Sequence, residues 1–183
     1  DFYMMTTEVT QRMYQELMGE NPSEFQSCGQ NCPVEMVDWH DAAAFANALS
    51  LYEDYDLCYV CEDDTCTAVA EPYSCSGYRL PTEAEWELAC RGNRTPPTQC
   101  WSADNVTEEL PDVQLLEPNG FGLFDMFGLV WEWCWDPYTL LKGGSFANPT
   151  GPVKGIHKRV LRGGSIAEKR VKINMNSRKS TEE

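Results

Sequence analysis

Long apolar runs and paired histidines are both missing from this chain of 183 residues. No run approaches the roughly 20 apolar residues that cross a bilayer as a helix, so the sequence predicts no membrane span. The two histidines, His40 and His157, lie far apart with no paired spacing, so histidine ligation of a metal is not expected. At 42% hydrophobic residues the chain is still well able to bury a core, which predicts one globular domain.

Basic residues are scarce in most of the chain and concentrated at its end. Residues 1–150 hold 5 Lys or Arg against 26 Asp or Glu and carry −21, whereas residues 151–183 carry +6. The acidic body disfavours nucleic acid and anionic membranes as partners. Two interpretations of the basic tail stay open: it packs against the acidic body, or it forms a face that recognises anions.

Cysteine, by contrast, is abundant, with nine residues in the chain. This number favours an oxidising compartment and therefore disulfides. Cys28 and Cys32 bracket a short turn that suits a local bridge. Four more cysteines lie in a polar insertion from Glu53 to Cys75 that has little apolar content, and two bridges are expected among them; a zinc site is the competing interpretation. These four are Cys58, Cys61, Cys66 and Cys75. Cys90 and Cys100 are expected to close a third loop, leaving Cys134 as a buried free thiol.

Helix signals are local and few. Thr10 precedes apolar residues at helical spacing and predicts a helix that ends by Gly19. Asp38 is expected to cap a second helix, Trp39 to Leu49. A capping box from Thr82 to Glu85 predicts a third helix to about Cys90. Val160 and Leu161 indicate a short strand.

The segment from Pro118 to Trp133 mixes two Trp, three Phe and glycines at 120, 122 and 128, and no regular element needs that mixture. Each glycine would cost a helix roughly 1 kcal/mol, so positive φ angles or close packing are expected. Asp125 and Glu132 flank Gly128, and their oxygens could converge on a cation such as Ca²⁺. The alternative is a loop whose aromatic side chains fill the core while both carboxylates face solvent.

Four further blocks accompany this segment in a fixed order. They are Glu8-Val-Thr10, Pro33 to Ala42, Tyr78-Arg-Leu-Pro-Thr-Glu-Ala-Glu-Trp-Glu87 and Arg159-Val-Leu-Arg-Gly-Gly-Ser165. In this order and spacing the chain resembles the formylglycine-generating enzyme family, also called sulfatase-modifying factors, from about Phe2 to Arg178. The resemblance implies an α+β, C-type-lectin-like fold with little regular secondary structure, stabilised by disulfides and calcium. It also implies one domain over residues 1–183, truncated at both ends, because the family's first and last strands are missing.

The family's catalytic residues do not carry over. Its oxidases bind copper and activate oxygen through a closely spaced cysteine pair after the Gly-Gly-Ser turn, and thiolates suit Cu(I) by their softness. Here Ile166 to Arg178 contains no cysteine, and Glu168 stands where the first of the pair is expected. A second enzymatic branch holds iron through three histidines, more than this chain has.

The family's calcium site does match, residue by residue. The resemblance implies side-chain ligands from Asp125 and Glu132 and main-chain carbonyl ligands from Gly128 and Val130, with Leu129 replacing the usual Asn. A second family calcium site would use Asn105 and Val106.

The sequence therefore predicts an exported domain (extracellular, periplasmic or on the cell surface) that is monomeric and non-catalytic. Calcium is expected to be a structural ion in it. Its expected partner is an unknown protein or a small anionic ligand, with no nucleic acid. The expected ligand surface comprises Trp131, Arg162, Ser165, Glu168, Arg170 and Arg178. Two alternatives remain: a formylglycine-generating oxidase that uses copper on a sulfatase cysteine, and a structural module of a larger surface protein.

Overall fold

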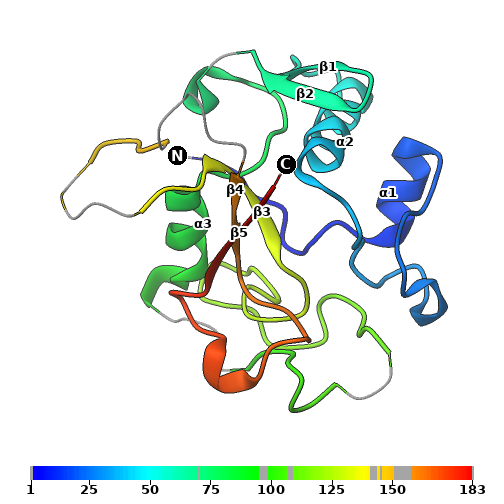
Figure 1. Cartoon of the computed structure of the whole chain (residues 1–183), viewed down its shortest axis with the longest axis vertical. Coiled ribbons are helices and arrows are strands. Elements are labelled where there is room, and N and C mark those ends of the chain that lie inside the picture. The colour runs from blue at the N-terminus through cyan, green and yellow to red at the C-terminus, as the bar shows by residue number, and fades with distance from the viewer. Residues whose placement is uncertain are drawn as a thin grey trace.

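The protein is described from a computed structural model that covers residues 2–69, 71–94, 99–106, 109–140, 144, 146–150 and 158–182. Its helices are α1 (Gln11–Met18), α2 (Trp39–Tyr52) and α3 (Glu83–Cys90). Its strands are β1 (Tyr59–Glu62), β2 (Thr65–Ala68), β3 (Glu132–Pro137), β4 (Lys158–Arg162) and β5 (Arg178–Glu182). Four short 3₁₀ turns complete the list: η1 (Gln26–Cys28), η2 (Pro72–Ser74), η3 (Gly92–Arg94) and η4 (Arg170–Lys172). In Figure 1, β3, β4 and β5 run through the middle, with α3 on one side and α1 and α2 on the other.

The three expected helices are confirmed, because each begins at a side-chain cap that the sequence displays. The Thr10 side chain accepts from the Met13 amide, and α1 stops at Gly19, which adopts φ 86°. At Thr82 both halves of the capping box form with Glu85, so two amides at the start of α3 are satisfied. Helix α2 also begins at its predicted cap but runs to Tyr52, beyond the expected end.

The central sheet is antiparallel with strand order β3-β4-β5, and its register brings charged residues into one row. Glu132 of β3 pairs with Arg162 of β4, which in turn pairs with Arg178 of β5. The strand predicted at Val160 and Leu161 is confirmed within β4. The register therefore sets Glu132, Arg162 and Arg178 next to one another across the three strands.

Much of the remaining chain is irregular and is held by core packing. Residues 109–131 contain neither a helix nor a strand, apart from an isolated bridge from Gly128 to Trp101. The largest core lies between α3 and the central sheet, a second lies between α2, the β1–β2 hairpin and Trp135, and a third joins Cys32, Leu110 and Leu129. Among the residues described, no helix is long and apolar enough to cross a membrane.

The polar insertion forms a small β1–β2 hairpin that two disulfides close. Cys58 pairs with Cys75 and Cys61 pairs with Cys66, so the zinc interpretation is wrong. The local Cys28–Cys32 bridge is confirmed as well. Bridges compensate here for the apolar surface that the insertion lacks.

The expected bridge between Cys90 and Cys100 is wrong. Both are free thiols, as is Cys134, and all three lie in the core between α3 and the sheet. Burial raises the pKa of Cys90 to about 12 and raises the pKa of Cys134 well above its ordinary value. These cysteines behave as small hydrophobic core residues rather than as reactive groups.

We therefore expect a defined labelling pattern from the cysteines. In the native protein, a bulky maleimide should label none of the three buried thiols, because none reaches solvent. After unfolding without a reductant, three of the nine cysteines should be alkylated, and all nine after reduction. Mass spectrometry of the intact chain counts the adducts. Four or more adducts without reductant would contradict the bridges and the oxidising compartment.

Candidate functional site

A close contact between the backbones of Gly128 and Trp101 helps to position the predicted ligands Asp125 and Glu132. An added Cβ at Gly128 would lie 1.9 Å from the Trp101 carbonyl oxygen, and Gly128 adopts φ 85°, so only glycine fits. Asp125 also has a positive φ of 52°. The chain thus turns at Asp125 and again at Gly128 before it enters β3 at Glu132. These turns bring Asp125 and Glu132, the two ends of the segment, toward each other.

Asp125 and Glu132 are near enough for their charges to interact, Glu8 interacts with both, and Gly163 lies over Glu132. Both carboxylate oxygens of Glu8, Oδ1 of Asp125 and Oε1 of Glu132 are buried without a hydrogen-bond partner among the described residues. The second oxygens are satisfied: Gln114 N donates to Asp125 Oδ2 at 2.6 Å, and Trp86 Nε1 donates to Glu132 Oε2 at 2.9 Å. An added Cβ at Gly163 would lie 3.2 Å from Glu132 Oε1, so the turn covers this oxygen tightly.

The charge of Asp125 acts on Glu132, and the charges of Asp125 and Glu132 both act on Glu8. Burial raises the pKa of Glu132 to about 8; the hydrogen bond from Trp86 opposes this rise, and the charge of Asp125 adds to it. Burial also raises the pKa of Asp125. For Glu8, burial and then the charges of Glu132 and Asp125 raise the pKa well above its ordinary value. Buried carboxylates this close need protons or a cation to offset their charge.

The donor set fits calcium better than a metal bound by side chains alone. Among the residues that the structure describes, no three His, Cys, Asp or Glu side chains are arranged to hold a metal ion. Calcium, however, accepts main-chain carbonyl oxygens together with carboxylates. Orphaned oxygens on Asp125 and Glu132 therefore suit the expected set, in which Gly128 and Val130 would add carbonyls.

Sequence reasoning assigned no site role to Glu8. The Thr6 carbonyl accepts from Phe124 N at 2.9 Å, and this contact lays the N-terminal segment along the acidic loop. The only sequence signal for Glu8 was its place in the first family block.

At the expected second calcium site, the side chain of Asn105 makes local hydrogen bonds. Asn105 Oδ1 accepts from Ser102 N at 2.7 Å and from Ser102 Oγ at 3.1 Å, while Asn105 Nδ2 donates to the Cys100 carbonyl. The Asn105 side chain therefore closes a turn from Ser102 to Val106. This turn lines an open pocket of about 510 Å³ together with Arg170.

Three of the six expected ligand residues meet at one place. Trp131 Nε1 donates to Glu168 Oε1 at 3.4 Å, and Ser165 donates to Glu168 Oε2 from both its amide and its hydroxyl, at 2.9 and 2.5 Å. The Trp131 ring is partly exposed, and Lys179 Nζ lies 5.8 Å from its centre. The result is an aromatic surface flanked by one carboxylate and one ammonium group.

The expected ligand residues Arg162 and Arg178 lie elsewhere, in a largely buried ion-pair network. Arg162 is only 2% exposed, contacts Glu83 Oε1 at 3.3 Å and stacks on Trp86. Arg178 donates to both Glu83 oxygens, at 2.5 and 2.9 Å. Both arginines thus fasten the sheet to α3.

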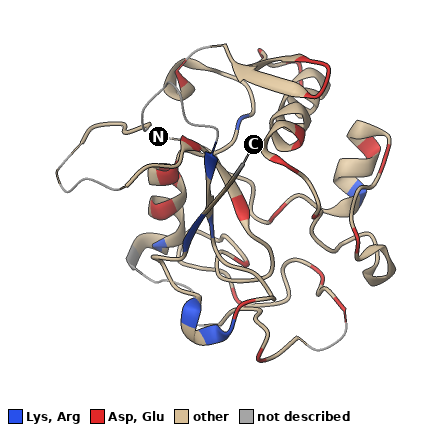
Figure 2. Ribbon diagram, in the orientation of Figure 1, with Lys and Arg blue, Asp and Glu red and all other residues tan. Residues whose placement is uncertain are grey.

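Arg170, the sixth expected ligand residue, is exposed on the basic turn η4. Its backbone amide donates to Asp104 Oδ2 at 2.8 Å, and one guanidinium nitrogen donates to the Ile173 carbonyl. Lys169 and Lys172 on either side are exposed. Figure 2 shows this turn as a basic patch at the end of the molecule away from the acidic hairpin.

Comparison with known families identifies the fold. The model of the sulfatase-modifying factor enzyme 1-like domain matches residues 1–183. The chain belongs to this family. The match confirms the expected family and its α+β fold.

Relatives of the sulfatase-modifying factor domain agree. Chaperone protein LppX of Paenibacillus barcinonensis is 31% identical over 176 residues, which cover 74% of this chain and 62% of LppX. Formylglycine-generating enzyme of Streptomyces coelicolor is 31% identical over 160 residues, 74% of this chain and 42% of that enzyme. Variable protein 1 of Treponema denticola superposes with a TM-score of 0.83 at 32% identity, covering 96% of this chain and 77% of that one. The chain spans less than two thirds of the length of the two curated relatives.

Proposed function

We propose that this sulfatase-modifying factor domain is an exported, calcium-stabilised binding domain without oxidase activity. The observation that carries the proposal is Glu168, which stands where the family's oxidases have their first copper-binding cysteine. Its carboxylate is occupied by Ser165 and Trp131 and shapes the surface there.

Formylglycine formation needs thiolate ligands for copper next to the substrate thiol, and residues 166–178 contain no cysteine. The last cysteine in the chain is Cys134, well before the Gly-Gly-Ser turn. Burial raises the pKa of all three free thiols, so none is a ready thiolate. A carboxylate is a hard ligand and does not replace a thiolate for Cu(I).

The same surface suits recognition. Trp131 offers a partly exposed ring, while Lys179 and the η4 turn with Arg170 supply positive charge around it. Aromatic and basic side chains favour an anionic small molecule or an acidic region of a protein. A relative named as a chaperone supports a protein ligand, and three disulfides support export.

Calcium belongs to this proposal as a structural ion. Asp125 and Glu132 would hold it through their side chains, and Gly128 and Val130 through their carbonyls. The bound ion would offset the buried negative charge, and the weak sites of extracellular modules are tuned to the millimolar calcium present there.

The test is a direct oxidase assay. Purified protein, with and without copper, is incubated under oxygen with a sulfatase-type Cys-x-Pro-x-Arg peptide, and the peptide mass and free thiol are followed. We expect no formylglycine, and no loss of thiol beyond that in a protein-free blank with the same copper, since the chain places no thiolate pair beside the substrate. The Streptomyces coelicolor enzyme, run in parallel, shows that the assay works. Formylglycine in the peptide, formed with this protein and absent from the protein-free blank, would establish the oxidase alternative instead.

A further inference from the structure

A second exposed surface lies at the end of α2. Residues 51–57, Leu-Tyr-Glu-Asp-Tyr-Asp-Leu, are all exposed, and we call this segment the acidic tyrosine loop. Leu51 is 65% exposed, Tyr52 73% and Tyr55 53%. Large apolar side chains that are exposed together in one short segment are a feature of interaction surfaces. In Figure 1 the end of α2 and the hairpin lie at the top of the molecule and η4 lies at the bottom.

The loop is held in shape from behind. Tyr55 N donates to the Ser50 carbonyl at 2.8 Å, and its ring packs edge-on against Tyr78 at 5.8 Å. Ser76 Oγ donates to Asp56 Oδ2 at 2.8 Å. The Cys58–Cys75 disulfide fastens the end of the loop. A partner would meet a preformed surface and lose little entropy in ordering it.

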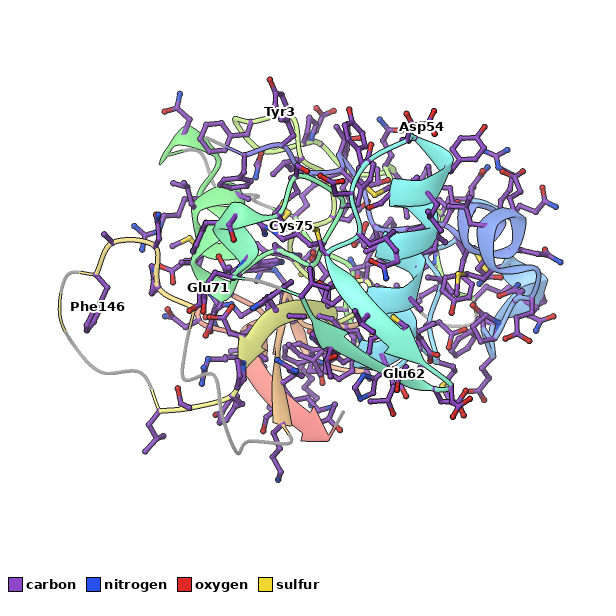
Figure 3. All side chains as sticks on the ribbon, turned by 90° about the horizontal axis from the view of Figure 1, so that it is seen from above. Tyr3, Asp54, Glu62, Glu71, Cys75 and Phe146 are labelled. Carbon is purple, nitrogen blue, oxygen red and sulfur yellow. A yellow bond between two sulfur atoms is a disulfide. The ribbon has the colours of Figure 1, made fainter. Side chains whose placement is uncertain are left out.

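Charge indicates what that partner carries. Glu53, Asp54 and Asp56 alternate with the tyrosines, and no Lys or Arg occurs between Arg12 and Arg79. Figure 3 places Asp54 at one end of α2, whereas Glu62, at the tip of the β1–β2 hairpin, lies toward the other end of that helix. The exposed apolar side chains therefore lie in a wholly acidic part of the sequence.

We propose that the acidic tyrosine loop docks an arginine- and lysine-rich segment of a protein partner. A guanidinium or ammonium group binds over a tyrosine ring within about 6 Å and pairs at the same time with a neighbouring carboxylate. The chain already uses this geometry internally, since Arg79 lies 5.8 Å from the Tyr73 ring centre and pairs with Glu85. Leu51 offers an apolar surface to the aliphatic part of such side chains.

The test measures binding of a labelled peptide of alternating arginine and serine, with citrulline replacing arginine in a neutral control peptide. The variant Tyr52→Ser/Glu53→Lys removes one ring and reverses one charge of the loop. We expect it to weaken arginine-peptide binding by at least about tenfold. The citrulline peptide should bind neither protein.

Because the chain carries −15 overall, general attraction has to be separated from docking. Tyr3→Ser/Glu109→Lys makes the same two changes at exposed positions outside the loop, and it should weaken binding by less than about twofold. Equal weakening by both variants would show general electrostatics and overturn the proposal. Self-association that the loop variant abolishes would also overturn it, by identifying a second copy as the occupant. Unchanged circular dichroism establishes that both variants fold.

Discussion

Replacing Glu83 with Gln should lower the free energy of unfolding by about 3–5 kcal/mol, the usual cost of breaking a buried ion pair. The β4–β5 register sets Arg162 beside Arg178, so two like charges share one side of the sheet. Glu83, from the first turn of α3, contacts both guanidinium groups. Glutamine keeps the size of the side chain but removes the negative charge that offsets the repulsion between the two guanidinium groups.

Thermal unfolding followed by circular dichroism measures the effect. At about 2–4 °C per kcal/mol for a chain of this size, the melting temperature should fall by roughly 10 °C. Glu87→Gln on the same helix is the matched control. Glu87 contacts Arg162 only at 3.9 Å and is more exposed, so its loss should cost about 1 kcal/mol or less. Equal effects of the two substitutions would show that Glu83 does not bridge the arginines.

The elements that sequence analysis located have local signals. Thr10, Asp38 and Thr82 cap their helices through amides only a few residues away, so the chain itself states where each helix begins. The disulfide-closed insertion was equally local, because a polar segment with four cysteines cannot pack itself. The order and spacing of the five sequence blocks then indicated the family, and the family implied the fold.

The errors concern contacts between distant segments. Arg162 and Arg178 were expected at a ligand surface, yet both are held by Glu83, and nothing in a sequence shows how far an arginine is buried. Cys90 and Cys100 looked suited to a bridge by spacing alone, but both point into the core formed by α3 and the sheet. Glu8 reaches the acidic cluster through contacts between distant segments, among them the hydrogen bond from Phe124 N to the Thr6 carbonyl.

Removing calcium should destabilise the domain strongly if the acidic cluster holds the ion. At free calcium about one hundred times the dissociation constant, binding adds about 2.7 kcal/mol to the free energy of unfolding. Adding EDTA should therefore lower the melting temperature by roughly 5–10 °C. Without the ion, Asp125 and Glu132 each retain a buried oxygen that accepts no hydrogen bond from the described part of the chain.

The amide variant Asp125→Asn/Glu132→Gln gives the sharper result, because it should reverse the order of stability. In calcium it should melt below the wild type, having lost the ion. In EDTA it should melt above the wild type, since it no longer buries two neighbouring carboxylates. Glu109→Gln at an exposed position should follow the wild type in both buffers. Atomic emission should find calcium in the wild type and in Glu109→Gln but not in the amide variant.

If EDTA shifts no melting temperature, protons rather than calcium neutralise the cluster. The pKa of about 8 for Glu132 would then govern stability. The free energy of unfolding would fall as the pH rises from about 4 to 8, because the folded state would hold a proton that the unfolded state has released.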